Sequence, residues 1–166
     1  MHLLPRWPTI LSALLLGIGI AASAAAADTT NGALSYKGRT AALKFAWLVS
    51  GPDDMAPGKT VRRLILSATD IGAKIEACKT FSCTDSDLKE GMTVEFGSGP
   101  RLNYWVVLNG QLIQYSGTAK PETFTARANE AGRVAGKLAI DDVAAGGPKI
   151  DAEFDVKLMK EFKVAR

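Results

Sequence analysis

The sequence predicts an all-β, mainly antiparallel fold, arranged as a β-sandwich of about seven to nine short strands, with an immunoglobulin-like outline as one candidate form. Throughout residues 28–166, short apolar runs alternate with clusters of Gly, Pro, Asn and Asp, which is typical of strands joined by tight turns. Several runs alternate apolar and polar residues with a period of two, as strands with one buried face do. A small β-barrel is the alternative architecture.

The first predicted strands follow from these runs. The period-two positions are Leu43, Phe45, Trp47 and Val49 in residues 42–49, and Met92, Val94 and Phe96 in residues 92–96. Residues 60–67 end in a continuous run of Leu and Ile, which favours a central strand that is covered on both faces.

Residues 101–117 predict a hairpin around Asn109-Gly110, because both residues tolerate the positive φ of a type I′ turn. A two-residue loop pairs Val106 with Ile113 and Tyr104 with Tyr115. Both faces of this hairpin are apolar, so we expect it to lie centrally with a cover on each side.

Residues 133–140 and 149–156 predict a second hairpin. Pairing Arg133 with Asp155 and Lys137 with Asp151 gathers opposite charges on the outer face, while the apolar residues share the inner face. Helical structure is expected only as one or two short turns, in residues 68–78 and 86–91, and as a short basic helix over residues 156–166.

Residues 1–27 have the layout of a secretory signal peptide: Arg6, an apolar run over residues 10–20 and a small-residue stretch that ends at Ala27. A membrane anchor is the other interpretation, but alanine gives little transfer energy into lipid and no basic flank follows. We therefore expect one β-rich domain over residues 28–166, periplasmic or secreted, with no stable membrane insertion after the signal is removed.

The composition excludes several function classes. Without residues 1–27 the net charge is +2 and no basic run occurs, so we expect no nucleic-acid partner. His2 is the sole histidine of the chain, so the expected mature protein lacks the usual general base and metal ligand. No nucleophile elbow, P-loop or dinucleotide fingerprint is present. We expect no cofactor, no metal and no catalytic residue.

Cys78 and Cys83 are the two cysteines of the chain. In an oxidising compartment such a pair forms a disulfide, whereas a redox pair would favour C-x-x-C spacing and a zinc site would need about four ligands. Residues five apart in a helix have Cα atoms about 8.6 Å apart, which exceeds the disulfide range. We therefore expect a disulfide-closed loop that turns back on itself.

Other polar clusters suggest chemistry less specifically. The acidic segment 84–90 offers oxygen ligands for calcium but lacks the EF-hand pattern. Paired carboxylates, as used in glycoside hydrolysis, occur at Asp53-Asp54 and Asp141-Asp142. Ser–Lys catalysis would draw on Ser35 with Lys37, or on Ser67 with Lys74. Surface turns and caps account for each of these clusters.

A partner contact is expected at residues 97–105, where Arg101, Asn103 and Tyr104 follow a Gly-Pro loop. Aromatic residues and Arg are favoured anchors of recognition sites. The competing interpretation places Tyr104 and Trp105 in the core, and for Trp105 we expect burial.

The segments LSYKGRTAALKFAWLV, VRRLILSATD, GPRLNYWVVLNGQLIQYSG and GGPKIDAEFDVKLMKEF, behind an alanine-rich signal, loosely resemble small, uncharacterised exported proteins of proteobacteria. The resemblance implies export and a β-domain, and it carries no activity. The function expected from the residues is a non-enzymatic binding or interaction domain for an envelope protein or ligand, with inhibitor-like or protective variants. The alternative is a carboxylate- or Ser–Lys-dependent hydrolase of envelope polymers.

Overall fold

The computed structural model describes residues 28–53, 56–97 and 99–166. The expected signal peptide (1–27) and Asp54 lie outside the described residues. Within them the chain forms ten strands, one short α-helix and three 3₁₀ turns, which confirms a β-rich fold with few helical turns. The elements are β1 Thr29–Tyr36, β2 Arg39–Leu43, β3 Phe45–Pro52, β4 Thr60–Ser67, α1 Gly72–Ala77, η1 Phe81–Cys83, β5 Gly91–Phe96, β6 Leu102–Leu108, β7 Ile113–Ala119, η2 Pro121–Thr123, β8 Phe124–Glu130, β9 Arg133–Asp141, η3 Val143–Ala145 and β10 Lys149–Glu161.

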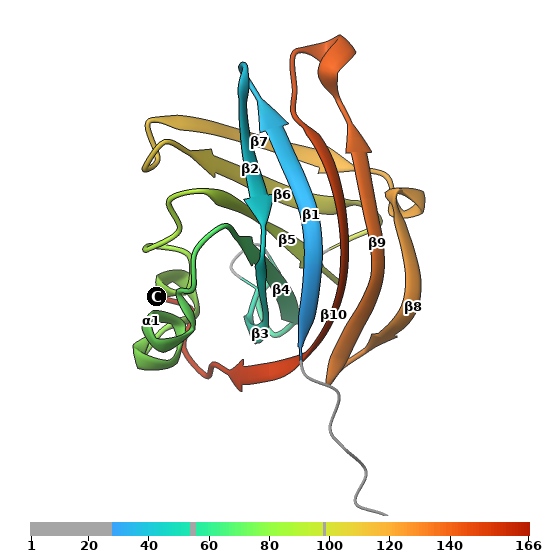
Figure 1. Ribbon diagram of the computed structural model, residues 1–166. Coiled ribbons are helices and arrows are strands. Elements are labelled where there is room, and N and C mark those ends of the chain that lie inside the picture. The colour runs from blue at the N-terminus through green and yellow to red at the C-terminus, as the bar shows by residue number, and fades with distance from the viewer. Residues whose placement is uncertain (1–27, 54–55, 98) are drawn as a thin grey trace, which may run out of the picture.

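All ten strands belong to one sheet, with the order β2-β1-β10-β3-β4-β5-β6-β7 and with β9 and β8 branching from β10. The first part of β10 pairs antiparallel with β1 and β9, and its last residues pair parallel with β3. The long strand β10 therefore forms the corner at which the sheet turns, and β5, β6 and β7 cross behind β1, β9 and β10 (Figure 1). Strands that switch between two faces make such corners in β folds.

This topology corrects the expected architecture. The sheet is mixed, because β3 and β10 are parallel, and a sandwich of two separate sheets is not confirmed, because β10 belongs to both halves. The described pairings run from β2 to β7 without returning, so the sheet is a curled half-barrel. Sequence patterns locate the strands but do not reveal that one strand serves both halves.

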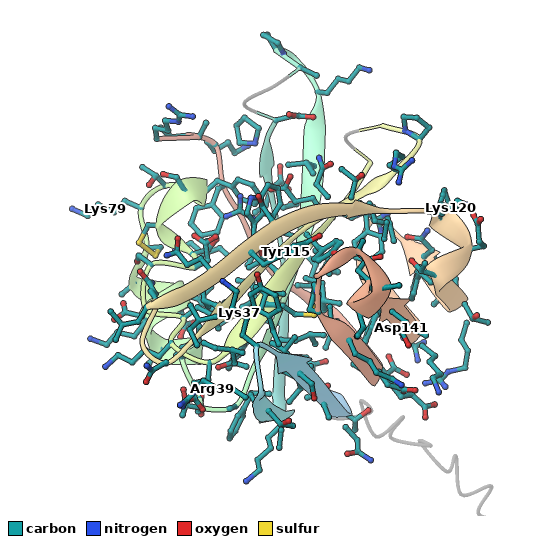
Figure 2. All side chains as sticks on the ribbon, turned by 90° about the horizontal axis from the view of Figure 1, so that it is seen from above. Lys37, Arg39, Lys79, Tyr115, Lys120 and Asp141 are labelled. Atoms are coloured by element: carbon teal, nitrogen blue, oxygen red, sulfur yellow. A yellow bond between two sulfur atoms is a disulfide. The ribbon has the colours of Figure 1, made fainter. Side chains whose placement is uncertain are left out.

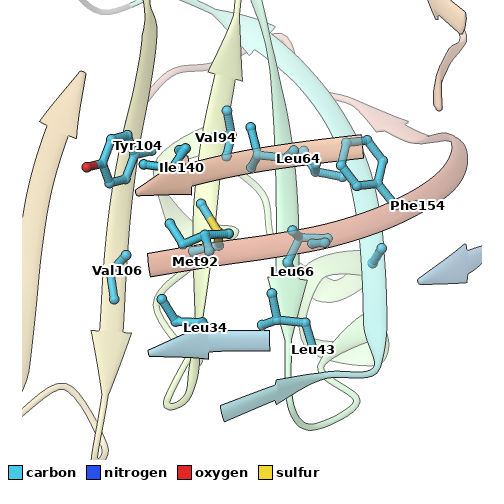
Figure 3. Close-up of a cluster of buried hydrophobic side chains, with 14 of the residues drawn as sticks. Leu34, Leu43, Leu64, Leu66, Met92, Val94, Tyr104, Val106, Ile140 and Phe154 are labelled. Carbon is cyan, nitrogen blue, oxygen red and sulfur yellow. The ribbon is translucent and has the colours of Figure 1, made fainter. Parts of the chain in front are cut away.

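The main core lies inside the curl and draws on almost every strand (Figure 3). The central strand β4 contributes Leu64 and Leu66, and β5 contributes the predicted alternating face of Met92, Val94 and Phe96. Tyr104 from β6 and Phe154 from β10 are the largest fully buried side chains. Burial of such residues is the main favourable contribution to folding.

The hairpin of β6 and β7 forms, but its register differs from the prediction. Leu108 pairs with Ile113 and Val106 with Tyr115, because the turn spans four residues, with Asn109, Gly110 and Gln111 at φ values of 52°, 64° and 73°. The shift is by two residues, so every side chain stays on its predicted face.

The hairpin of β9 and β10 is also shifted by two, with Ala135 opposite Asp155. The predicted ion pairs nevertheless form diagonally: Arg133 lies 2.6 Å from Asp155 and Lys137 lies 3.0 Å from Asp151. Long basic side chains reach the diagonal neighbour, so charge complementarity did not fix the register.

The predicted basic helix at the C-terminus is wrong. Strand β10 continues to Glu161, and Phe162 is buried against the outer face of the sheet. Alternate residues of β10, such as Phe154 and Val156, are buried in the core, and this burial keeps the segment in the sheet. It outweighs the three-residue spacing of the basic residues, which had suggested a helix. The expected turn at residues 68–78 does form as α1, where the backbone N–H of Gly72 donates to the Asp70 carboxylate at 2.9 Å.

Candidate functional site

The disulfide loop covers the outer face of β3 and β4. Cys78 and Cys83 are joined, with Cα atoms 5.7 Å apart, which confirms the predicted pairing. A second buried cluster lies beneath this cover and contains Val49, Val61, Ile65, Ile71, Ile75, Cys78, Phe81, Leu88 and Phe162. The Nζ of Lys160 donates to the carbonyls of Glu76 and Cys78 at 2.7 and 2.6 Å, so β10 also holds the end of α1. The disulfide is a structural part of this cover.

Arg63 forms the edge of the covered region. Its guanidinium donates to Glu95 at 2.8 Å and lies 4.2 Å from the ring centre of Phe81. It also donates to Thr84 at 3.2 Å and lies 3.5 Å from Asp85. Side chains of Arg63 and Glu95 are only 13% and 12% exposed. Because these contacts use the donor groups of Arg63, the cluster fixes the loop against β4 and β5.

Trp105 lies where the cover ends. It was expected in the core, but it is 39% exposed, because the even-numbered residues of β6 face the core and the odd-numbered ones face outward. Outward-facing residues of β7 are likewise exposed. We define the Trp105 surface as Asn103, Trp105, Gln114, Ser116 and Thr118, the outward side chains of β6 and β7 around this indole.

Three hollows meet at Trp105. The first, of 380 Å³, lies toward the cover and is lined by Asp53, Arg63 and Glu95 among others. The second, of 480 Å³, is bounded by the turn at Asp85 and by Gln114. The third, of 300 Å³, follows β6 and β7 between Asn103 and Thr118. Their sizes lie in the range of small-molecule sites, and Trp105 lines all three.

The predicted contact residues divide between two faces. Asn103 is half-buried and lines two of the hollows. Arg101 is exposed just before β6 and donates to the Thr118 carbonyl at 3.3 Å. Tyr104 is fully buried on the core face, so it offers no exposed surface to a partner. Sequence reasoning missed the outward orientation of Trp105; the signal was its alternation with the buried residues of β6.

Tyr104 belongs to a cluster of the three tyrosines of the chain. The ring of Tyr115 packs against those of Tyr36 and Tyr104, at 5.3 and 5.9 Å between centres. The Tyr104 hydroxyl donates to Asp142, and burial, followed by this hydrogen bond, raises the pKa of Tyr104 above its ordinary value. Figure 2 views the molecule from this end, where Tyr115, Lys37 and Asp141 are labelled.

Most of the predicted catalytic pairings are separated or engaged in turns. Asp141 is exposed and lies 3.5 Å from Lys149, whereas Asp142 accepts from Tyr104. The hydroxyl of Ser35 bonds that of Thr40 at 3.0 Å, across the turn between β1 and β2. Buried Ser67 accepts from the Thr69 backbone, so the serines hold local turns.

The acidic segment 84–90 is likewise structural. Glu90 and Asp85 form ion pairs with Arg39 and Arg63. Among the described residues, no group of three or more His, Cys, Asp and Glu side chains is placed to hold a metal ion. One pair of carboxylates does share a hollow: Asp53 and Glu95 both line the first one.

No protein-family model, curated protein or solved structure matches the chain. Within residues 28–53, 56–97 and 99–166, none of the helices has the length and apolar character needed to cross a membrane.

Proposed function

We propose that the protein is an exported, non-enzymatic binding domain whose contact region is the Trp105 surface. The observation that carries the proposal is an exposed tryptophan on a rigid sheet, at the meeting point of three hollows. Trp is among the residues enriched at binding hot spots, and ligand sites combine aromatic side chains with a few well-placed polar groups.

The surroundings support rigid presentation of this surface. Strands pair with β6 on both sides: β7 along its whole length and β5 from Asn103 to Val107. Gln111 donates to the carbonyls of Ser86 and Leu88 at 3.1 and 3.2 Å, which ties the β6–β7 turn to the acidic turn beside the second hollow. A preorganised surface loses less entropy when a ligand binds.

A second candidate function is a carboxylate-dependent hydrolase, favoured by Asp53 and Glu95 in one hollow. Both carboxylates are engaged: Asp53 accepts from the backbone of Ala56 at 3.2 Å, and Glu95 accepts from Arg63. A glycosidase needs one carboxyl group free to protonate the leaving group and another free to attack or to activate water. The binding function therefore has the stronger support.

Affinity capture tests the proposal. The disulfide-bonded protein, secreted from its full-length gene, is immobilised and exposed to envelope extract, and the retained proteins and polymers are identified. Wild-type protein should retain a specific component that Trp105→Ala loses. Leu112→Ala is the matched control, since Leu112 is 81% exposed in the adjacent turn and lines none of the three hollows.

Turnover of the retained component separates the two candidates. If the retained polymer is cleaved by wild-type protein but not by Asp53→Asn or Glu95→Gln, the hydrolase function replaces the binding function.

Equal retention of the component by wild type and Trp105→Ala would refute the assignment of the Trp105 surface. The export part of the proposal is tested by the mass of the periplasmic protein, which should correspond to a chain that begins near residue 28.

A further inference from the structure

We infer that the Trp105 surface binds a chain of uncharged sugars, with one pyranose ring stacked on the indole. The inference rests on the proposed binding function and names its ligand class. It is carried by three features of the site: an approachable aromatic face, a border of neutral hydrogen-bonding groups, and hollows on more than one side of the ring.

The indole is approachable because its cross-strand neighbours are small. Trp105 pairs with Thr93 on β5 and with Ser116 on β7, and no ring–ring or cation contact to Trp105 occurs among the described residues. The face of an aromatic ring carries negative potential. The C–H hydrogens along one face of a pyranose are partly positive, so the two flat surfaces attract each other while the sugar hydroxyls stay at the edge.

The groups at that edge suit hydroxyls. Gln114, Ser116 and Thr118 are exposed beside the indole, and Asn103 lies opposite Thr118 and lines the same hollow. Amides and hydroxyls both donate and accept, which matches a ligand whose hydroxyls also do both. An apolar peptide would cover the exposed polar groups of Gln114, Ser116 and Thr118 without bonding to them, at a cost to affinity.

The charges at the site favour a neutral ligand. Arg63, at the edge of the cover, forms ion pairs with Glu95 and Asp85. Its positive charge is therefore already balanced within the protein. A polyanion would need several free cations, and an anionic surface would likewise need a basic patch. The five residues of the Trp105 surface are uncharged, and the charged residues that line the adjoining hollows are of both signs: Arg63 and Arg166 with Asp53, Asp85 and Glu95.

The arrangement of the hollows favours an oligosaccharide over a single sugar. Volumes of 480 and 300 Å³ lie on different sides of Trp105, one toward the acidic turn and the other along β6 and β7. A ligand centred on the indole can therefore extend both ways. Neighbouring rings of one chain then bind with a high effective concentration.

Isothermal titration tests the inference with three neutral probes, chitotetraose, cellotetraose and maltotetraose, and with tetragalacturonate as the charged comparator. The disulfide-bonded secreted protein should bind at least one neutral probe and should prefer it to the comparator. Trp105→Ala should weaken that affinity roughly 30-fold or more, as loss of a hot-spot tryptophan does. Trp105→Phe, which keeps a flat ring, should restore most of it.

Trp47→Phe is the matched control. Trp47 faces a separate hollow and lines none of those around Trp105, so its replacement should leave binding unchanged.

Cosedimentation with purified peptidoglycan sacculi distinguishes cell-wall sugars from free glycans as the source of the ligand. Trp105-dependent pelleting assigns the sugars to the cell wall, and binding of soluble probes alone assigns them to a free glycan; either result supports the inference.

Three outcomes would overturn it: no neutral probe binds, Trp105→Ala binds as wild type does, or the charged comparator binds best. The proposed function is judged separately by affinity capture. If no sugar binds while a protein partner is retained through Trp105, the sugar inference fails and the binding domain stands. If neither sugar nor protein depends on Trp105, both fail.

Discussion

Removing the disulfide should weaken the domain without unfolding it. Cys78 and Cys83 are five positions apart, so the bond closes a loop of about six residues. In the chain-entropy description, a loop of this size contributes about 2 kcal/mol to the free energy of unfolding. For a domain of this length, that corresponds to a melting temperature lower by about 7 °C. Cys78→Ala/Cys83→Ala should show this shift by circular dichroism.

Other contacts also hold this cover against the sheet, so the loss of stability in the double variant should stay at about 2 kcal/mol. The backbone N–H groups of Phe81 and Ser82 donate to Val164 and Ala165 at 2.9 Å, and Phe81 is buried against the sheet. Ser82→Ala, in the same loop but exposed, is the control and should melt within about 1 °C of wild type. Loss of the folded state at room temperature, or no shift at all, would refute the assignment of the disulfide as one support among several.

Three further predictions concern stability. Thr93 is 1% exposed and its hydroxyl has no partner among the described residues, so Thr93→Val should raise the free energy of unfolding by about 1 kcal/mol in a urea titration, whereas exposed Thr125→Val should change it little. Tyr104→Phe removes the hydrogen bond to Asp142 and should cost about 1.5–3 kcal/mol. The pKa of Tyr104 in the folded protein is raised above 10.0, so above about pH 10 the folded state keeps a proton that the unfolded chain releases. The free energy of unfolding of the wild type should therefore fall as the pH rises above about 10, and that of Tyr104→Phe should fall less. Lys160→Met keeps the apolar stem but not the bonds to two carbonyls, and should cost about 1–2 kcal/mol by thermal melting.

Local patterns predicted the strands because burial imposes a period of two on each of them. Met92, Val94 and Phe96 face the core as expected. The register of strand pairing in the two hairpins was not predicted correctly. In both hairpins a slip by two residues preserves every face, so hydrophobic alternation cannot detect it. The first turn is longer than predicted because Gln111 also adopts a positive φ, which is uncommon for a residue other than glycine.

The contact region predicted from the sequence overlaps the proposed Trp105 surface but is centred on a different side chain. Asn103 does line the hollows, whereas Tyr104 faces the core and Trp105 faces outward. Whether an apolar outer face is covered depends on where a distant segment packs. The cover made by α1 and the disulfide loop rests on β3 and β4 and stops at β6, and nothing within residues 101–117 encodes that limit.

The corner strand β10 also sets when the domain can form. It is the last strand of the chain, yet it pairs with the first, so that Thr29 lies opposite Asp155, and it pairs with β3 as well. Contacts between such distant residues make folding slow, and among the described strands it is β10 that joins the two halves of the sheet. A chain in which β10 is not yet paired therefore has two separate groups of strands and no closed main core.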